Sequence, residues 1–181
     1  MHKFRLADPK NLRSRSNRGA SESVRIYEWA HPGNEFSGVN IEWYTPGSWL
    51  SNDLADIGNM LGTDTSRDFS MALIAGHIDD LLESAKLGEL NRDQASICKR
   101  QPGVVEIRLP EPIELEQIRL LIRIYYGEPP EWGGLVSLCL GAKDDSPNWK
   151  TQQNASIDLA QQRGEFWLEK RGENREDPSH C

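Results

Sequence analysis

The sequence predicts an α+β fold in which a small antiparallel sheet packs against helices. Three observations support this class. Apolar residues recur at helical spacing between residues 65 and 88, the period changes to two in three runs between residues 104 and 140, and helical spacing returns after residue 150. The chain of 181 residues is long enough to bury one core, and we expect a single domain over residues 23–171.

The first elements are expected to be extended. Residues 24–29 and 39–44 alternate between apolar and polar side chains, and the segment between them begins with typical turn chemistry, His-Pro-Gly-Asn. These runs predict an N-terminal strand or hairpin. Residues 49–61 then fit a short helix, with apolar side chains at Trp49, Leu54, Ile57 and Leu61.

The clearest helix follows. Thr65 and Ser66 offer a capping hydroxyl, Asp68 places an acidic residue in the first turn, and Gly88 is a suitable stop. The apolar residues at helical spacing are Ile74, Ile78, Leu81, Leu82 and Ala85. His77 within this helix is interpreted as a structural or surface residue, because no second ligand lies at a metal-binding spacing.

Three consecutive strands are predicted next, at residues 104–109, 118–126 and 135–140, and short connections make them an antiparallel meander. In the first strand Val105, Ile107 and Leu109 face inward, whereas Glu106 and Arg108 face outward. In the second strand the inward set is Ile118, Leu120, Ile122 and Ile124, and the other face carries Arg119, Leu121, Arg123 and Tyr125.

The last element is expected to be a helix from about residue 151 to residue 170, so the predicted sheet is packed with two central helices and a C-terminal helix. Residues 1–22 are rich in Arg, Lys, Asn and Ser and predict a basic disordered arm. This arm is compatible first with a solubilising tail and second with an RNA-touching segment. Residues 172–181 predict a polar tail.

Composition limits the function classes. The net charge of -7 counts against nucleic-acid binding by the whole surface, although a local basic face remains compatible with it. No apolar run is long enough for a membrane span, and the first residues do not resemble a secretory signal. Cys98, Cys139 and Cys181 show neither a disulfide framework nor zinc-site spacing, so we expect a reducing, cytoplasmic location.

Several short motifs occur in a familiar order. The strand motif Val-Glu-Ile-Arg ends at Arg108, Arg119 opens Arg-Leu-Leu-Ile, and the apolar run Leu-Val-Ser-Leu leads to Lys143. A final helix then contains Ala160-x-x-Arg163. Over residues 39–170 this order resembles the RelE/HigB-type toxins of bacterial type II toxin–antitoxin systems.

The resemblance implies a metal-independent endoribonuclease that cleaves mRNA on the ribosome, without a cofactor, and is neutralised by an antitoxin protein. In that chemistry a ribose 2′-OH attacks the adjacent phosphate while cations stabilise the charge that develops. By position, Arg108, Arg119 and Lys143 match the family's phosphate-stabilising residues. No residue in the matching region is expected to bind a metal.

The residues support part of this hypothesis independently. Arg119 and Arg123 lie on one face of the second strand, and Arg108 is expected on the neighbouring strand, so their guanidinium groups converge as phosphate donors. Tyr125 on the same face is a candidate for base stacking or a phosphate contact. Arg123, Tyr125 and Lys150 are therefore the predicted RNA-binding residues.

Three alternatives remain at this stage. The arginines are equally compatible with the solvent-facing half of a sheet, paired with Glu106, Glu114 and Glu116. The acidic pair Asp144 and Asp145 after Lys143 favours a non-catalytic protein-binding module of the same fold. Trp132 and Trp149 are the candidate anchors of such an interface, although Trp149 also fits an ordinary core position. An unrelated enzyme has little support, because the sequence lacks a nucleophile elbow and a phosphate-binding glycine loop.

Overall fold

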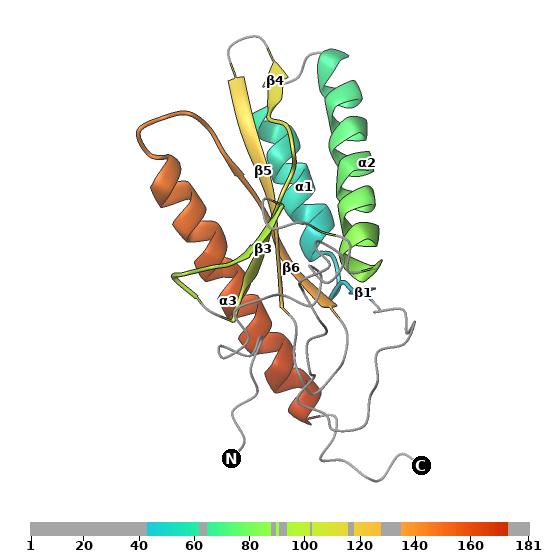
Figure 1. Ribbon diagram of the computed structural model, residues 1–181, viewed down its shortest axis with the longest axis vertical. Coiled ribbons are helices and arrows are strands. Elements are labelled where there is room, and N and C mark those ends of the chain that lie inside the picture. Colours follow the sequence, from blue (N-terminus) through green and yellow to red (C-terminus); the bar gives the residue numbers. More distant parts are fainter. Residues whose placement is uncertain are drawn as a thin grey trace, which may run out of the picture.

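The computed structural model of the chain describes residues 43–61, 65–87, 90, 94–101, 103–115, 118–127 and 135–173. Within these ranges two helices precede a run of strands, and a long helix ends the fold (Figure 1). In chain order the elements are β1 (Trp43–Tyr44), α1 (Trp49–Met60), α2 (Thr65–Leu87), β2 (Ala95–Ile97), β3 (Val105–Arg108), β4 (Ile113–Leu115), β5 (Ile118–Gly127), β6 (Leu135–Lys143) and α3 (Trp149–Glu173).

The described strands form a sheet in the order β1-β6-β5-β3-β2, in which β1 runs parallel to β6 and the other neighbours are antiparallel. β4 pairs with the first part of β5. β3 and β4 therefore follow one another along the same side of β5, and Pro110 and Pro112 separate them because proline has no N–H for the ladder. Leu109 N continues the pairing across this break by donating to Ile122 O over 3.2 Å.

Helices cover both faces of the sheet. On one face α1 and α2 pack against the alternate strand residues that the sequence predicted to point inward, including Val105, Ile107, Leu120, Ile122 and Ile124. On the other face α3 covers a second cluster that contains Tyr125, Leu138, Ile157 and Trp167. Figure 1 shows α3 on the opposite side of the sheet from α1 and α2. The sheet is thus the middle layer of three.

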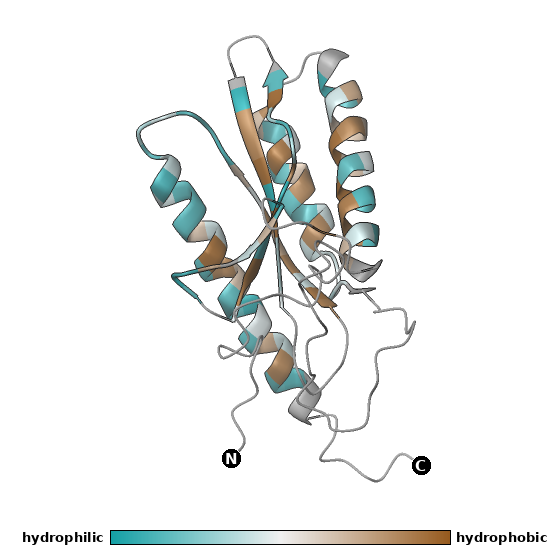
Figure 2. Cartoon of the chain, viewed as in Figure 1, coloured by the Kyte–Doolittle hydropathy of each residue, from teal (hydrophilic) through white to brown (hydrophobic). Residues whose placement is uncertain are grey.

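The sequence pattern explains the orientation of α2. Its buried side carries Ile74, Ile78, Leu81 and Ala85, which recur every three or four residues. Acidic residues such as Asp79, Asp80 and Glu83 occupy the exposed side of its second half, and Figure 2 shows this alternation of apolar and polar bands.

The predicted α+β class and its helix–sheet packing are confirmed. The short strands β2 and β4 were not predicted, because three residues are too few to show a period. α3 begins at Trp149 and ends at Glu173, beyond the predicted limits on both sides. The predicted arm over residues 1–22, the strand at residues 24–29 and residues 174–181 lie outside the described residues.

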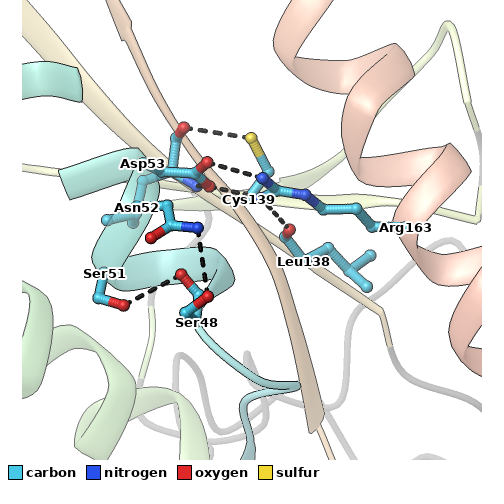
Figure 3. A network of polar contacts seen from close by, with 8 residues as sticks. Ser48, Ser51, Asn52, Asp53, Leu138, Cys139 and Arg163 are labelled. Atoms are coloured by element: carbon cyan, nitrogen blue, oxygen red, sulfur yellow. Dashed lines mark hydrogen bonds and ion pairs between the residues drawn. The ribbon is translucent and has the colours of Figure 1, made fainter. Parts of the chain in front are cut away.

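A buried ion pair closes the outer edge of β6. β1 pairs with β6 only over two residues, and beyond them α1 and α3 supply side chains to the edge. Asp53 of α1 accepts a hydrogen bond from Leu140 N at 2.9 Å, and Arg163 of α3 donates to Leu138 O at 2.9 Å (Figure 3). The two side chains also join each other over 2.6 and 2.8 Å. This clamp satisfies an edge that would otherwise be open to pairing.

No helix in the described parts of the chain is long and apolar enough to cross a membrane.

Candidate functional site

Four cationic side chains occupy one face of the central strands, the face that α3 covers in part. The register places Arg108 of β3 opposite Arg123 of β5. Lys143 of β6 lies opposite Leu121 of β5, and Leu121 is two positions from Arg119 on one side and from Arg123 on the other. Residues that face each other in neighbouring strands point to the same side of a sheet, as do alternate residues of one strand. The structure therefore brings together the predicted residues Arg108, Arg119, Arg123 and Lys143.

A buried carboxylate organises the inner part of this cluster. The Glu106 side chain is 4% exposed, and its Oε1 accepts hydrogen bonds from Arg108 Nε at 2.8 Å and from Arg123 Nη1. Its Oε2 accepts a hydrogen bond from Gln153 Nε2 of α3 at 2.8 Å. The prediction that Glu106 points to the outside of the fold was wrong, because that side of β3 lies beneath α3.

The two arginines around Glu106 differ in access. The Arg123 side chain is 12% exposed and is held against Glu106, so it is a positioned internal cation. The Arg108 side chain is 39% exposed, and its Nη2 also donates to Ser96 Oγ of β2 at 2.7 Å. Arg108 is therefore fixed at one end and still reaches solvent.

Lys143 connects the inner cluster to the start of α3. Its Nζ donates to Gln153 Oε1 at 3.3 Å and lies 4.2 Å from the centre of the Trp149 ring. Burial lowers the pKa of Lys143 below the ordinary value, and the positive charge of Arg123 lowers it further. The lysine is thus a better proton donor than a fully solvated one.

Arg119 forms the outer rim. Its side chain is 51% exposed and lies beside two exposed carboxylates, with 3.4 Å between Nε and Glu114 Oε1 and 3.3 Å between Nη1 and Asp145 Oδ2. Such exposed pairs are weak and exchange readily with other anions. Asp145, one of the acidic pair that favoured a protein-binding module in the sequence, is a partner of Arg119.

Two of the predicted RNA-binding residues, Tyr125 and Lys150, border this cluster but do not belong to it. Tyr125 shares the face but is 0% exposed, packed with the apolar residues beneath α3, and burial raises the pKa of its hydroxyl well above the ordinary value. No base or phosphate reaches it, so its predicted role was wrong. Lys150 is exposed in the first turn of α3, beside Trp149.

The sequence assigned no role to Gln153 and placed Trp149 mainly in the core. Gln153 bridges Glu106 and Lys143 across the sheet–helix boundary, and no local pattern marks a glutamine for such a role. Trp149 was expected mainly in the core, yet it is 43% exposed at the edge of the cluster. Its position directly after Asn148 and Ser146, both good helix-start residues, was the available signal.

The cluster has the chemistry of an anion site. Arg108, Arg119, Arg123 and Lys143 contribute four positive charges against three negative charges from Glu106, Glu114 and Asp145. Asp144 beside Lys143 adds a fourth negative charge and exposed Lys150 adds a fifth positive charge, so the surroundings carry one positive charge in excess in a chain of net charge -7. Within the described ranges, no group of three or more His, Cys, Asp or Glu side chains is arranged to hold a metal ion.

Comparisons of the chain with protein-family models, with curated proteins and with solved structures found no match.

Proposed function

We propose that the protein is a metal-independent endoribonuclease of the RelE/HigB toxin type, which cleaves mRNA on the ribosome and is neutralised by a cognate antitoxin. The observation that supports this proposal most is the presence of Arg108, Arg119, Arg123 and Lys143 on one face of the sheet. Guanidinium and ammonium groups held in place by other side chains stabilise a developing phosphorane charge without reorganisation.

The exposed members of the cluster take the roles that need contact with RNA. Arg119 donates to the non-bridging oxygens of the scissile phosphate. Arg108 lies opposite Arg123, roughly 13 Å further along the sheet, and donates to another phosphate of the same strand. Lys150 contacts the strand at the rim. Arg123 keeps a supporting role, because its side chain is 12% exposed and is tied to Glu106. It positions the cluster and adds positive charge behind the phosphate.

The proton transfers use Asp145 and Lys143. The Asp145 carboxylate is 58% exposed and lies 3.3 Å from Arg119. It takes the proton from the ribose 2′-OH while the 2′-oxygen attacks phosphorus. The bond from phosphorus to the 5′-oxygen breaks, and Lys143 gives its proton to that oxygen. The products are a 2′,3′-cyclic phosphate and a free 5′-OH, so no metal, water or cofactor enters the step.

Cleavage of a defined message on purified ribosomes tests the proposal. Arg119→Ala removes one charge-stabilising donor, and losses of roughly 100-fold in rate are typical for such a removal. Arg100→Ala is the matched control, because Arg100 is 50% exposed, is also paired with an aspartate, and lies outside the cluster. Product ends carrying 5′-OH groups, lost with Arg119→Ala and kept with Arg100→Ala, are expected. Equal cleavage by both variants would contradict the site.

A second candidate is a non-catalytic protein-binding module of the same fold. The observation that favours it is an apolar strip on the outer side of α2, where Phe69 is 74% exposed and Leu73, one turn later, is 43% exposed. This function predicts a folded protein that cleaves no message. Phe69→Ser would then abolish binding to the partner, whereas Arg119→Ala would leave it unchanged.

A further inference from the structure

Trp149 is a large aromatic residue that the fold leaves accessible. It is 43% exposed, whereas Trp167 on the same helix is 8% exposed and belongs to the core beneath α3. The first turns of α3 that follow it are polar (Figure 2). Trp149 therefore contributes little to the core, and its position at the edge of the cationic cluster is better explained by contact with a ligand.

The backbone that carries Trp149 is fixed. Trp149 N donates to Ser146 O at 3.0 Å, and Ser146 N donates to Asp144 Oδ1 at 3.0 Å. Asp144 N in turn donates to Gln152 Oε1 at 3.1 Å, which ties the loop to α3. The ring is thus presented from an ordered turn, and little conformational entropy is lost when a ligand packs on it.

One face of the ring already has a partner that suits a nucleotide site. Lys143 Nζ lies 4.2 Å from the ring centre, a cation–π distance. Lys143 shares its sheet face with Arg119, and Arg119 contacts Asp145 of the loop that leads to Trp149. The aromatic surface and the exposed phosphate-binding cations are therefore neighbours.

We propose that Trp149 stacks on an unpaired nucleobase of the RNA strand whose phosphate lies at Arg119 and Lys143. This inference rests on the proposed function and adds a base-binding position to it. Stacking of a base on an aromatic side chain typically raises affinity by about 10-fold and accepts any of the bases, since each has a π face. The site thus holds single-stranded RNA without demanding a particular base at this position.

Two single strands separate base stacking from phosphate binding. One is a hexamer of 2′-deoxyuridine, which lacks the attacking hydroxyl and is not cleaved. The other is a hexamer of abasic deoxyribose units with the same number of phosphates. Both carry the same fluorophore, and their affinities for the full-length protein at low salt are measured by fluorescence anisotropy.

The expected result is that the protein binds the deoxyuridine strand about 10-fold more tightly than the abasic strand, in line with one stacked base. Trp149→Ala abolishes this preference for the deoxyuridine strand, whereas Trp149→Phe, which keeps an aromatic ring beside Lys143, retains most of it. Arg119→Ala weakens binding of both strands alike. Circular dichroism confirms that each variant is folded.

Each contrary outcome is distinct. Equal affinity for the two strands, both lost with Arg119→Ala, would overturn the stacking inference and leave the proposed function standing. A preference for deoxyuridine that survives in Trp149→Ala would also overturn it, because another residue would hold the base. Absence of binding to either strand would also overturn the stacking inference, whereas the proposed function is judged separately by the cleavage assay on purified ribosomes.

Discussion

Replacing Asp53 by Asn tests how much the clamp between α1 and α3 stabilises the fold. The Asp53 carboxylate is 8% exposed and accepts hydrogen bonds from Leu140 N and from both terminal nitrogens of Arg163. Asparagine keeps the shape and one acceptor but removes the charge. The Arg163 guanidinium, 17% exposed, is then left without its counter-ion.

The magnitude follows from this burial. Breaking a buried ion pair by removing one partner costs roughly 3–5 kcal/mol, because the remaining charge stays desolvated. Water reaches part of Arg163, which places the expected loss for Asp53→Asn at the lower end, about 3 kcal/mol. That loss raises the unfolding constant by roughly 100-fold. Urea unfolding followed by circular dichroism at neutral pH measures it.

Asp158→Asn is the matched control. Asp158 of α3 holds Arg100 through two hydrogen bonds of 2.8 and 2.6 Å, a pairing of the same type as that of Asp53 with Arg163. The Arg100 side chain is 50% exposed and the Asp158 side chain is 34% exposed, so water solvates either one when the other is replaced. A much smaller loss is expected. Equal losses in the two variants would refute the reasoning that burial decides the contribution of these pairs.

Other predictions concern packing, thiols and proton transfer. Gly141→Ala should destabilise the fold by about 1–3 kcal/mol, because the new Cβ would lie 2.6 Å from Ser156 Oγ of α3. Gly76→Ala, on the open side of α2, should stabilise the fold by about 0.5–1 kcal/mol. Urea unfolding measures both changes. Cys98 and Cys139 should resist iodoacetamide at pH 8 in the folded protein, because burial raises the pKa of the Cys98 thiol to about 12 and that of the Cys139 thiol further. Peptide mass spectrometry measures the labelling; equally fast labelling of native and urea-unfolded samples would contradict the prediction. The cleavage rate should fall as pH rises through the lowered pKa of Lys143, below the ordinary 10.5, because only the protonated lysine can donate; a rate that stays constant up to pH 10.5 would exclude it as the acid.

The alternation of the central strands made one face of the sheet predictable. Val105 and Ile107, together with Ile122 and Ile124, pack against α1 and α2 as their period of two indicates. The same period says only that the remaining residues share the other face. It does not say whether that face meets water or another helix.

The position of α3 decided what the sequence left open. Glu106 and Arg123 looked like surface residues because they are charged, yet they neutralise each other under the helix. Tyr125 on the same face was the sequence signal for a covering layer, since a fully solvated face rarely carries such an aromatic residue between charges. Contacts such as that of Gln153 with Glu106 join residues far apart in the chain, and no local pattern encodes them.

Induced expression in a bacterial host, with mapping of mRNA ends and of growth, tests the central claim most directly. The wild-type protein is expected to arrest growth and to create new internal ends in messages. Arg108→Ala combined with Arg119→Ala should remove both effects while the protein remains folded and abundant. Normal growth and intact messages with the folded wild-type protein, or unchanged cleavage by the double variant, would contradict the account.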